Sequence, residues 1–149
     1  MASEIRQPRS DELAQARQIA EDSMAQVYRH LLGGVSLVAP EPEPWKNSWV
    51  ALVDDVIVGV GMTRDDRVTD LWLLPQARGH RLGSQLLSLL EAEIKARDHC
   101  EARLRVVAEN TRARAFYRAR GWIEGDEFAQ EQLGIPMLNM HKPLLRTSD

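Results

Sequence analysis

Residues 71–84 decide how this chain folds, and they read Leu71-Trp72-Leu73-Leu74-Pro75-Gln76-Ala77-Arg78-Gly79-His80-Arg81-Leu82-Gly83-Ser84. The first four residues are apolar or aromatic, as in a strand, and Pro75 closes that strand because it lacks a backbone N–H. A glycine-containing turn follows. Apolar residues then recur at helical spacing, at Leu82, Leu86, Leu89, Leu90 and Ile94. The stretch predicts a strand, a tight turn and an amphipathic helix over residues 82–96.

The turn has the features of an anion-binding site. The first turn of a helix leaves backbone N–H groups without intrahelical partners, and these donors and the helix dipole attract negative charge. Gly79 and Gly83 carry no Cβ where phosphates would approach the backbone, and Arg78 and Arg81 can add charge-assisted hydrogen bonds. A tight turn without any ligand would use the same glycines, so that alternative stays open. The segment matches neither a Walker loop nor the dinucleotide fingerprint.

Strand and helix signals flank this segment on both sides. Upstream, we expect a strand at 5–8, a helix N-cap at Ser10, and one amphipathic helix, or two, from Leu13 to Leu31 that ends at Gly33-Gly34. Three strands with short connections follow at 49–53, 56–62 and 68–74. Downstream, we expect a strand at 102–107, a helix at 110–119 and a closing pair of strands at 122–124 and 136–141.

This order of elements predicts an α/β (α+β) fold. Short connections favour an antiparallel meander, whereas the strand–helix–strand step from residue 71 to 107 requires a right-handed parallel crossover. A mixed, mostly antiparallel sheet of six to seven strands flanked by helices packs these elements economically. There is no internal repeat, and Ala39–Pro44 is too short for a domain linker, so residues 1–149 are expected to form one domain.

Composition excludes several classes of protein. The net charge is −3 and the pI is near 5.8, which argues against a nucleic-acid partner. Arginine nevertheless supplies all but three of the 19 basic residues, and many lie between Arg78 and Arg120. They form either solvated helix faces or a local patch for an anionic ligand, since the planar guanidinium suits phosphate. No apolar run is long enough to span a bilayer, so we expect no membrane partner.

Cys100 is the only cysteine, which rules out a disulfide within the chain. The absence of a secretory signal at the N-terminus and the lone thiol favour a cytoplasmic protein. We expect Cys100 to be a buried or half-buried residue rather than a nucleophile. No group of His, Cys and Asp residues has the spacing of metal ligands, so no metal is expected.

The turn resembles the acyl-CoA-binding motif of the GNAT superfamily of N-acetyltransferases, written Q/R-x-x-G-x-G/A. Arg78 takes the first position of the motif and Gly83 the last, while Arg81 stands where the family usually has its middle glycine. A side chain is tolerated there if residue 81 is already helical. The resemblance implies acetyl-CoA as co-substrate. The cofactor-binding residues that it implies are Leu71, Trp72, Leu73, Arg78, Gly79, His80, Arg81, Leu82, Gly83, Ser84, Asn110 and Phe116.

A second segment agrees, since residues 110–122 resemble the family's N-x-x-A-x-x-F-Y-x-x-x-G-F, with Trp122 in place of the last phenylalanine. In the family, the asparagine lines the pantetheine arm and the tyrosine protonates the CoA thiolate as it leaves. The resemblance therefore assigns these roles to Asn110 and Tyr117. A phenol, with a pKa near 10, is protonated at neutral pH and can donate. Structural alternatives stay open: Asn110 as a helix N-cap, and Phe116 with Tyr117 as an aromatic pair in the core.

The family's reaction is a direct attack of a neutral amine on the thioester carbonyl. Backbone N–H groups near Leu73 would polarise that carbonyl if the strand splays from its parallel neighbour, as it does in the family. The glutamate that some relatives use as general base corresponds to Arg105, so this base is absent. Asp70, acting through a water, is the candidate base, although it is also typical of a strand-end carboxylate. Glu109 is a second alternative and equally suits the start of a helix.

The resemblance predicts an N-acetyltransferase whose acceptor is a small-molecule or peptide amine. Glu41 and Glu43, in the loop before the second strand, either attract a cationic acceptor or keep the loop soluble. Because Arg105 replaces the glutamate, a CoA-binding regulatory or interaction module without turnover is the alternative. The resemblance also leaves a homodimer open, since many relatives pair through their C-terminal strands.

Overall fold

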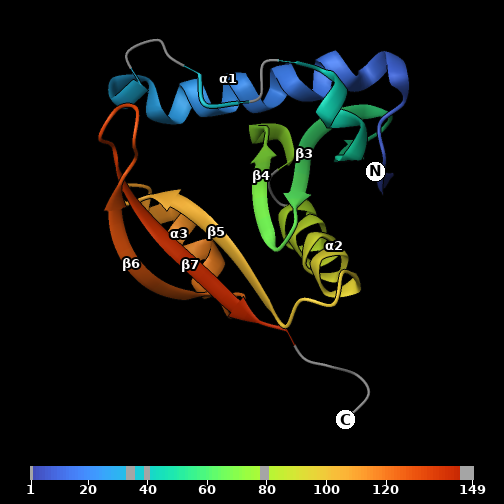
Figure 1. The fold of residues 1–149 in the computed structure, drawn as a ribbon. Coiled ribbons are helices and arrows are strands. Elements are labelled where there is room, and N and C mark those ends of the chain that lie inside the picture. The colour runs from blue at the N-terminus through green and yellow to red at the C-terminus, as the bar shows by residue number, and fades with distance from the viewer. Residues whose placement is uncertain (1, 33–35, 39–40, 78–80, 145–149) are drawn as a thin grey trace. The chain divides into compact units, whose positions relative to one another are not determined.

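Short turns connect most of the strands, and apolar residues alternate along them. The computed structural model describes residues 2–32, 36–38, 41–77 and 81–144 (Figure 1). The helices are α1 (Leu13–Leu32), α2 (Leu82–Ala96) and α3 (Thr111–Arg118), with 3-10 turns η1 (Ser10–Glu12), η2 (Glu43–Asn47) and η3 (Pro75–Ala77). The strands are β1 (Ser3–Arg6), β2 (Trp49–Val53), β3 (Val56–Arg64), β4 (Arg67–Leu73), β5 (Glu101–Val107), β6 (Ile123–Ala129) and β7 (Pro136–Pro143).

The strands form one mixed sheet in the order β1-β2-β3-β4-β5-β7-β6. The pairs β1–β2, β2–β3, β5–β7 and β6–β7 are antiparallel. The pair β4–β5 is parallel, with Arg67 opposite Arg103 and Val68 opposite Leu104. The mixed sheet and the parallel crossover through α2 confirm the predicted fold class.

The chain divides into two compact units. The first comprises Met1–Thr63 and Asp70–Leu90, and the second Arg64–Thr69 and Glu91–Asp149.

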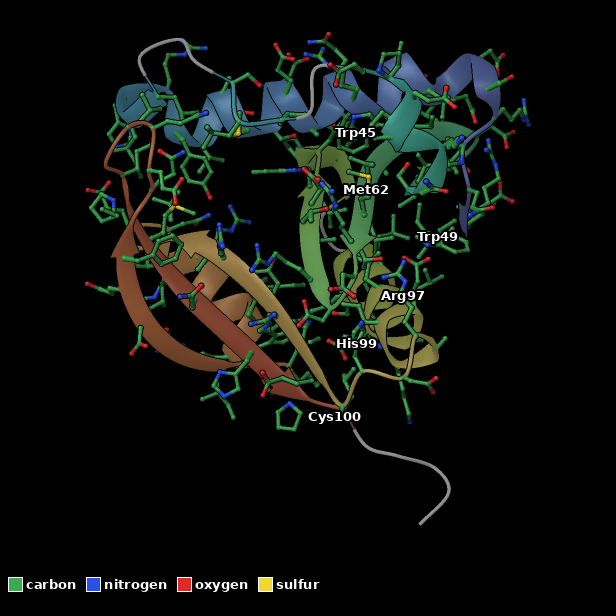
Figure 2. The ribbon with its side chains drawn as sticks, viewed as in Figure 1. Trp45, Trp49, Met62, Arg97, His99 and Cys100 are labelled. Atoms are coloured by element: carbon green, nitrogen blue, oxygen red, sulfur yellow. The ribbon has the colours of Figure 1, made fainter. Side chains whose placement is uncertain are left out.

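In the first unit, β3 contains glycine at two alternate positions, and neighbouring elements approach both closely: α2 at Gly61 and β4 at Gly59. A Cβ at Gly61 would lie 2.9 Å from Leu90 Cδ1, and one at Gly59 would lie 3.3 Å from the carbonyl oxygen of Trp72. The buried residues of this core are Ala51, Val58, Ala77, Leu82 and Leu86. Trp45, which is labelled in Figure 2, is fully buried where η2 meets α1.

In the second unit, β5 alternates between the core and solvent. Ala102, Leu104 and Val106 are buried, whereas Glu101, Arg103 and Arg105 are exposed. Glu91 links α2 to β7 and to the residue before β6, because its carboxylate accepts hydrogen bonds from Lys142 Nζ at 2.8 Å and from Trp122 Nε1 at 3.1 Å. Near the end of α2, Arg97 donates to the carbonyl oxygen of Asp65 at 2.8 Å, and Figure 2 shows Arg97 above His99 and Cys100.

Most predicted elements are confirmed, and α2 has the predicted bounds. The first helix is interrupted at Tyr28, whose φ of −119° and ψ of 18° are not helical, as the alternative of two helices anticipated. Its predicted end at Gly33-Gly34 lies outside the described residues.

Four predictions were wrong. The first strand, expected at 5–8, extends from Ser3 to Arg6, where it pairs with β2. Ser10 is not an N-cap, since it begins the 3-10 turn η1, which Arg9 caps through a hydrogen bond from its N–H to Glu12 Oε1 at 2.8 Å. The strand expected at 122–124 extends from Ile123 to Ala129, because pairing with β7 sustains it beyond its local pattern. Cys100 is exposed, since it lies in the bend between α2 and β5.

Across the described ranges, none of the helices combines the length and the apolar character needed to cross a membrane.

Candidate functional site

The step from β4 into α2 belongs to the first unit, and its most informative residue is Arg81. The backbone of Arg81 has a φ of +58°, the left-handed region that glycine adopts without steric cost. Its carbonyl oxygen accepts the N–H of Gln85 at 3.1 Å, so helical hydrogen bonding begins immediately after it. Residue 81 is therefore not helical, so the condition under which a side chain was expected to be tolerated there is not met. The position of the motif's middle glycine keeps a glycine-like conformation here although the side chain is arginine.

Leu82 and Gly83 are buried at the start of α2, and Ser84 is half-buried. Arg78, Gly79 and His80 lie outside the described residues. The first turn of an α-helix presents backbone N–H groups and the positive end of its dipole, and buried Gly83 has no Cβ to obstruct an approach to them. These properties suit a phosphate.

The end of β4 has one edge directed away from β3. The N–H of Leu74 donates to the carbonyl oxygen of Val58 at 2.8 Å, so it points toward β3. Successive N–H groups along a strand point to opposite edges. The N–H of Leu73 therefore points away from β3, toward the edge where β4 pairs with β5 at its beginning. This is the orientation that the predicted role of Leu73 requires.

Asp70 is hydrogen-bonded to the side chain of Trp72 in the first unit. Its Oδ1 accepts a hydrogen bond from Trp72 Nε1 at 3.0 Å. The Trp72 ring in turn meets the ring of Tyr28 edge-on, with centroids 6.3 Å apart. The carboxylate of Asp70 is therefore held in a defined direction by a side chain two residues along the strand, and its role as a base stays a prediction.

In the second unit, Asn110 forms the predicted helix cap. Its Oδ1 accepts the N–H of Ala113 at 3.2 Å, and its carbonyl oxygen accepts the N–H of Arg114 at 3.0 Å. The structural alternative for Asn110 is thus confirmed, and its contact with acetyl-CoA stays a prediction. Glu109, the second candidate base, is exposed immediately before this cap.

Tyr117 lies on α3 in an aromatic cluster. It is 9% exposed, and its ring meets those of Phe116 and Trp122 edge-on, with centroid distances of 5.3 and 5.9 Å. The guanidinium of Arg120 stacks over Phe116 at 3.9 Å from the ring centroid. The aromatic pair is confirmed, but only Tyr117 is in the core, since Phe116 is half-buried. The cluster fixes the ring that would carry the donor hydroxyl.

Sequence reasoning missed two features. Gly59 and Gly61 were assigned only to a strand, although their spacing of two places both on one face of β3, where α2 and β4 approach closely. Arg67 lies opposite Arg103 across the β4–β5 pair. The alternation of arginines along β5 was the available signal for this second feature.

Among residues that the structure describes, no three His, Cys, Asp or Glu side chains form a group that could hold a metal ion.

A model of the acetyltransferase (GNAT) family matches residues 11–122, and the chain belongs to this family. No curated protein sequence matches the chain. Three solved structures illustrate the likeness of the fold. Ard1 from Thermoplasma volcanium is 18% identical, with 98% of this chain and 100% of that chain covered and a TM-score of 0.75.

The second is Arabidopsis thaliana Naa50 in complex with the bisubstrate analogue CoA-Ac-MVNAL. It is 18% identical, with 97% of this chain and 100% of that chain covered and a TM-score of 0.72. The third is the PaiA N-acetyltransferase from Thermoplasma acidophilum in complex with coenzyme A, at 19% identity, 96% and 99% coverage and a TM-score of 0.68. These likenesses establish the fold, and the family model confirms the resemblance drawn from residues 78–84 and 110–122.

Proposed function

We propose that residues 1–149 form an acetyl-CoA-dependent N-acetyltransferase domain of the cytoplasm, which transfers an acetyl group to a primary amine of a small molecule or peptide. The observation that carries this proposal is the left-handed backbone of Arg81 at the entry to α2, in a chain that belongs to the GNAT family. That conformation lets the chain turn tightly into a helix whose first-turn N–H groups suit a pyrophosphate. Complexes of similarly folded proteins with CoA, such as that of PaiA, support acetyl-CoA as the co-substrate.

The proposed reaction needs a hydrogen-bond donor to the carbonyl oxygen, a general base for the amine and a general acid for the thiolate. The Leu73 N–H would stabilise negative charge on the carbonyl oxygen, since a fixed donor costs no reorganisation during reaction. Asp70 would accept a proton from the amine through a water, and Tyr117 would donate one to sulfur. The amine nitrogen bonds to the carbonyl carbon as the C–S bond breaks. One proton leaves the amine and one reaches the thiolate, so the products are an acetylated amine and CoA.

Calorimetric titration with acetyl-CoA tests the phosphate loop. We expect micromolar binding that is weakened with desphospho-CoA and lost in Gly83→Glu, because a carboxylate at the first turn competes with phosphate for the same donors. Ser88→Glu adds the same charge at an exposed position further along α2 and should bind normally. Absence of binding by well-folded parent protein would refute the proposal, as would equal effects of the two substitutions.

A binding module without turnover is the second candidate, and one observation favours it. Arg105 occupies the position of the glutamate that serves some relatives as base, and its guanidinium lies over the ring of Phe128, 5.2 Å from the centroid. Thiol release with a panel of amines separates the two functions. An enzyme releases CoA and slows in Tyr117→Phe, whereas a binding module retains acetyl-CoA affinity and acetylates no amine.

A further inference from the structure

Three arginines lie on one face of the sheet in the second unit. Arg67 on β4 is directly opposite Arg103 on β5 in the parallel pair. Paired residues share a face of a sheet, and so do residues two apart along a strand, so Arg105 lies on this face as well. Asn139 and His141 of β7 are opposite Arg105 and Arg103, and therefore extend the same face.

The positive charge of this face is only partly neutralised. Arg103 forms a salt bridge with Asp66 at 2.7 Å. In the described part of the chain no carboxylate forms a salt bridge with Arg67 or Arg105, and the guanidinium of Arg105 rests on Phe128 instead. Partial burial, followed by repulsion from Arg105 and Arg103, lowers the pKa of Arg67. Three cationic side chains thus share one carboxylate partner.

Such an arrangement is unfavourable for the fold alone. Like charges directly opposite each other in a sheet destabilise the pair. A guanidinium offers several N–H donors in a planar fork that matches a carboxylate or a phosphate, and several forks on one face can bind one anion from different sides. Asn139 and His141 add further polar groups along the same surface. The arrangement therefore has the chemistry of an anion-binding surface.

We propose that the face of Arg67, Arg103 and Arg105 binds an anionic group, a carboxylate or a phosphate, carried by the amine acceptor. This inference rests on the proposed function, since Arg105 corresponds to the residue that acts on the acceptor amine in some relatives.

Matched acceptors that differ in charge test the proposal. Glutamate against glutamine, and O-phosphoserine against serine, are compared by thiol release at constant ionic strength. We expect kcat/KM to favour one of the anionic members about tenfold or more, since guanidinium–anion hydrogen bonds are charge-assisted. The pair that shows the preference distinguishes a carboxylate from a phosphate. In the Arg67→Gln/Arg105→Gln double variant the preference should fall to about twofold or less.

Arg118→Gln is the control for loss of a positive charge. Arg118 Nε lies 3.7 Å from Glu124 Oε1. Glu124 is paired with Met140, and Met140 is paired with Leu104, so Glu124 lies on the face of the sheet opposite to that of the three arginines. This variant should keep the preference for anions. Thermal unfolding checks that the double variant is folded, and relief of repulsion should leave it at least as stable as the parent.

A second readout does not depend on turnover. NMR of the arginine Nε–Hε signals, in protein saturated with CoA, should shift with glutamate or O-phosphoserine and not with glutamine or serine. If acetyl-CoA binds and no amine is acetylated, the proposed enzyme fails while this readout still reports on the anion site. Equal use of charged and neutral acceptors, or equal shifts with both, would overturn the anion site while leaving the acetyltransferase intact.

Discussion

Replacing Arg81 tests whether the backbone at the entry to α2 is left-handed, and the comparison needs two variants. Arg81→Ala removes the guanidinium but keeps a Cβ at a φ of +58°. Arg81→Gly removes both. The left-handed conformation costs an L-residue about 1–2 kcal/mol, whereas glycine gives back about 0.4–1 kcal/mol through its larger freedom in the unfolded chain. The difference leaves the glycine variant more stable than the alanine variant by about 0.5–1 kcal/mol.

Denaturant unfolding measures this difference, and a thermal scan should show it as a shift of about 1–3 °C for a chain of this length. Titration with acetyl-CoA separates the effect on stability from the effect on binding. Both variants should still bind acetyl-CoA, but with weaker affinity than the parent, because the positive charge of Arg81 is gone. If the alanine variant were as stable as the glycine variant, or more stable, residue 81 would not be left-handed in solution. The interpretation that position 81 keeps a glycine-like backbone in spite of its arginine side chain would then be wrong.

Three further predictions concern the scaffold of the site. Gly61→Ala should lower the free energy of unfolding by about 1–2 kcal/mol, because its Cβ would lie 2.9 Å from Leu90 Cδ1, and denaturant titration measures the loss. Asn110→Ala should cost about 1 kcal/mol in the same assay through loss of the cap of α3. Hydrogen bonds from Arg6 lower the pKa of Glu12 to about 2, so stability from this pair is present above pH 4.5 and is lost as the pH falls toward 2. Glu12→Gln should therefore destabilise by on the order of 1 kcal/mol at pH 7 and by clearly less near pH 2, where the carboxylate of the parent is partly protonated.

Each of these has a control and an outcome that contradicts it. Unchanged stability of Gly61→Ala would mean that α2 lies further from β3 than the structure places it. Asn110→Asp keeps an acceptor at the cap, so a loss as large as that of alanine would show that the cap is not the cause. A destabilisation by Glu12→Gln that persists unchanged at pH 2 would exclude the depressed pKa as its source.

Local sequence determined the elements and the family. Helical spacing of leucines after the turn fixed α2, because burying one apolar stripe requires that period. The motifs at residues 71–84 and 110–122 predicted the GNAT family, because each motif is a short stretch that can be read from the sequence alone, and the family model confirmed it. The prediction for Cys100 failed because exposure in a bend depends on how the flanking elements pack, which local pattern does not report.

Tertiary structure decided what depends on residues distant in sequence. The left-handed backbone of Arg81 contradicts the preference of an isolated arginine, so local propensity does not predict it. The direction of the Leu73 N–H became evident only from the bond between Leu74 and Val58. Arg67 and Arg103 are 36 positions apart, and only the parallel register brings them together. Sequence sets the local conformational preferences, while strand pairing selects which side chains share a face, because register is a property of two strands and not of one.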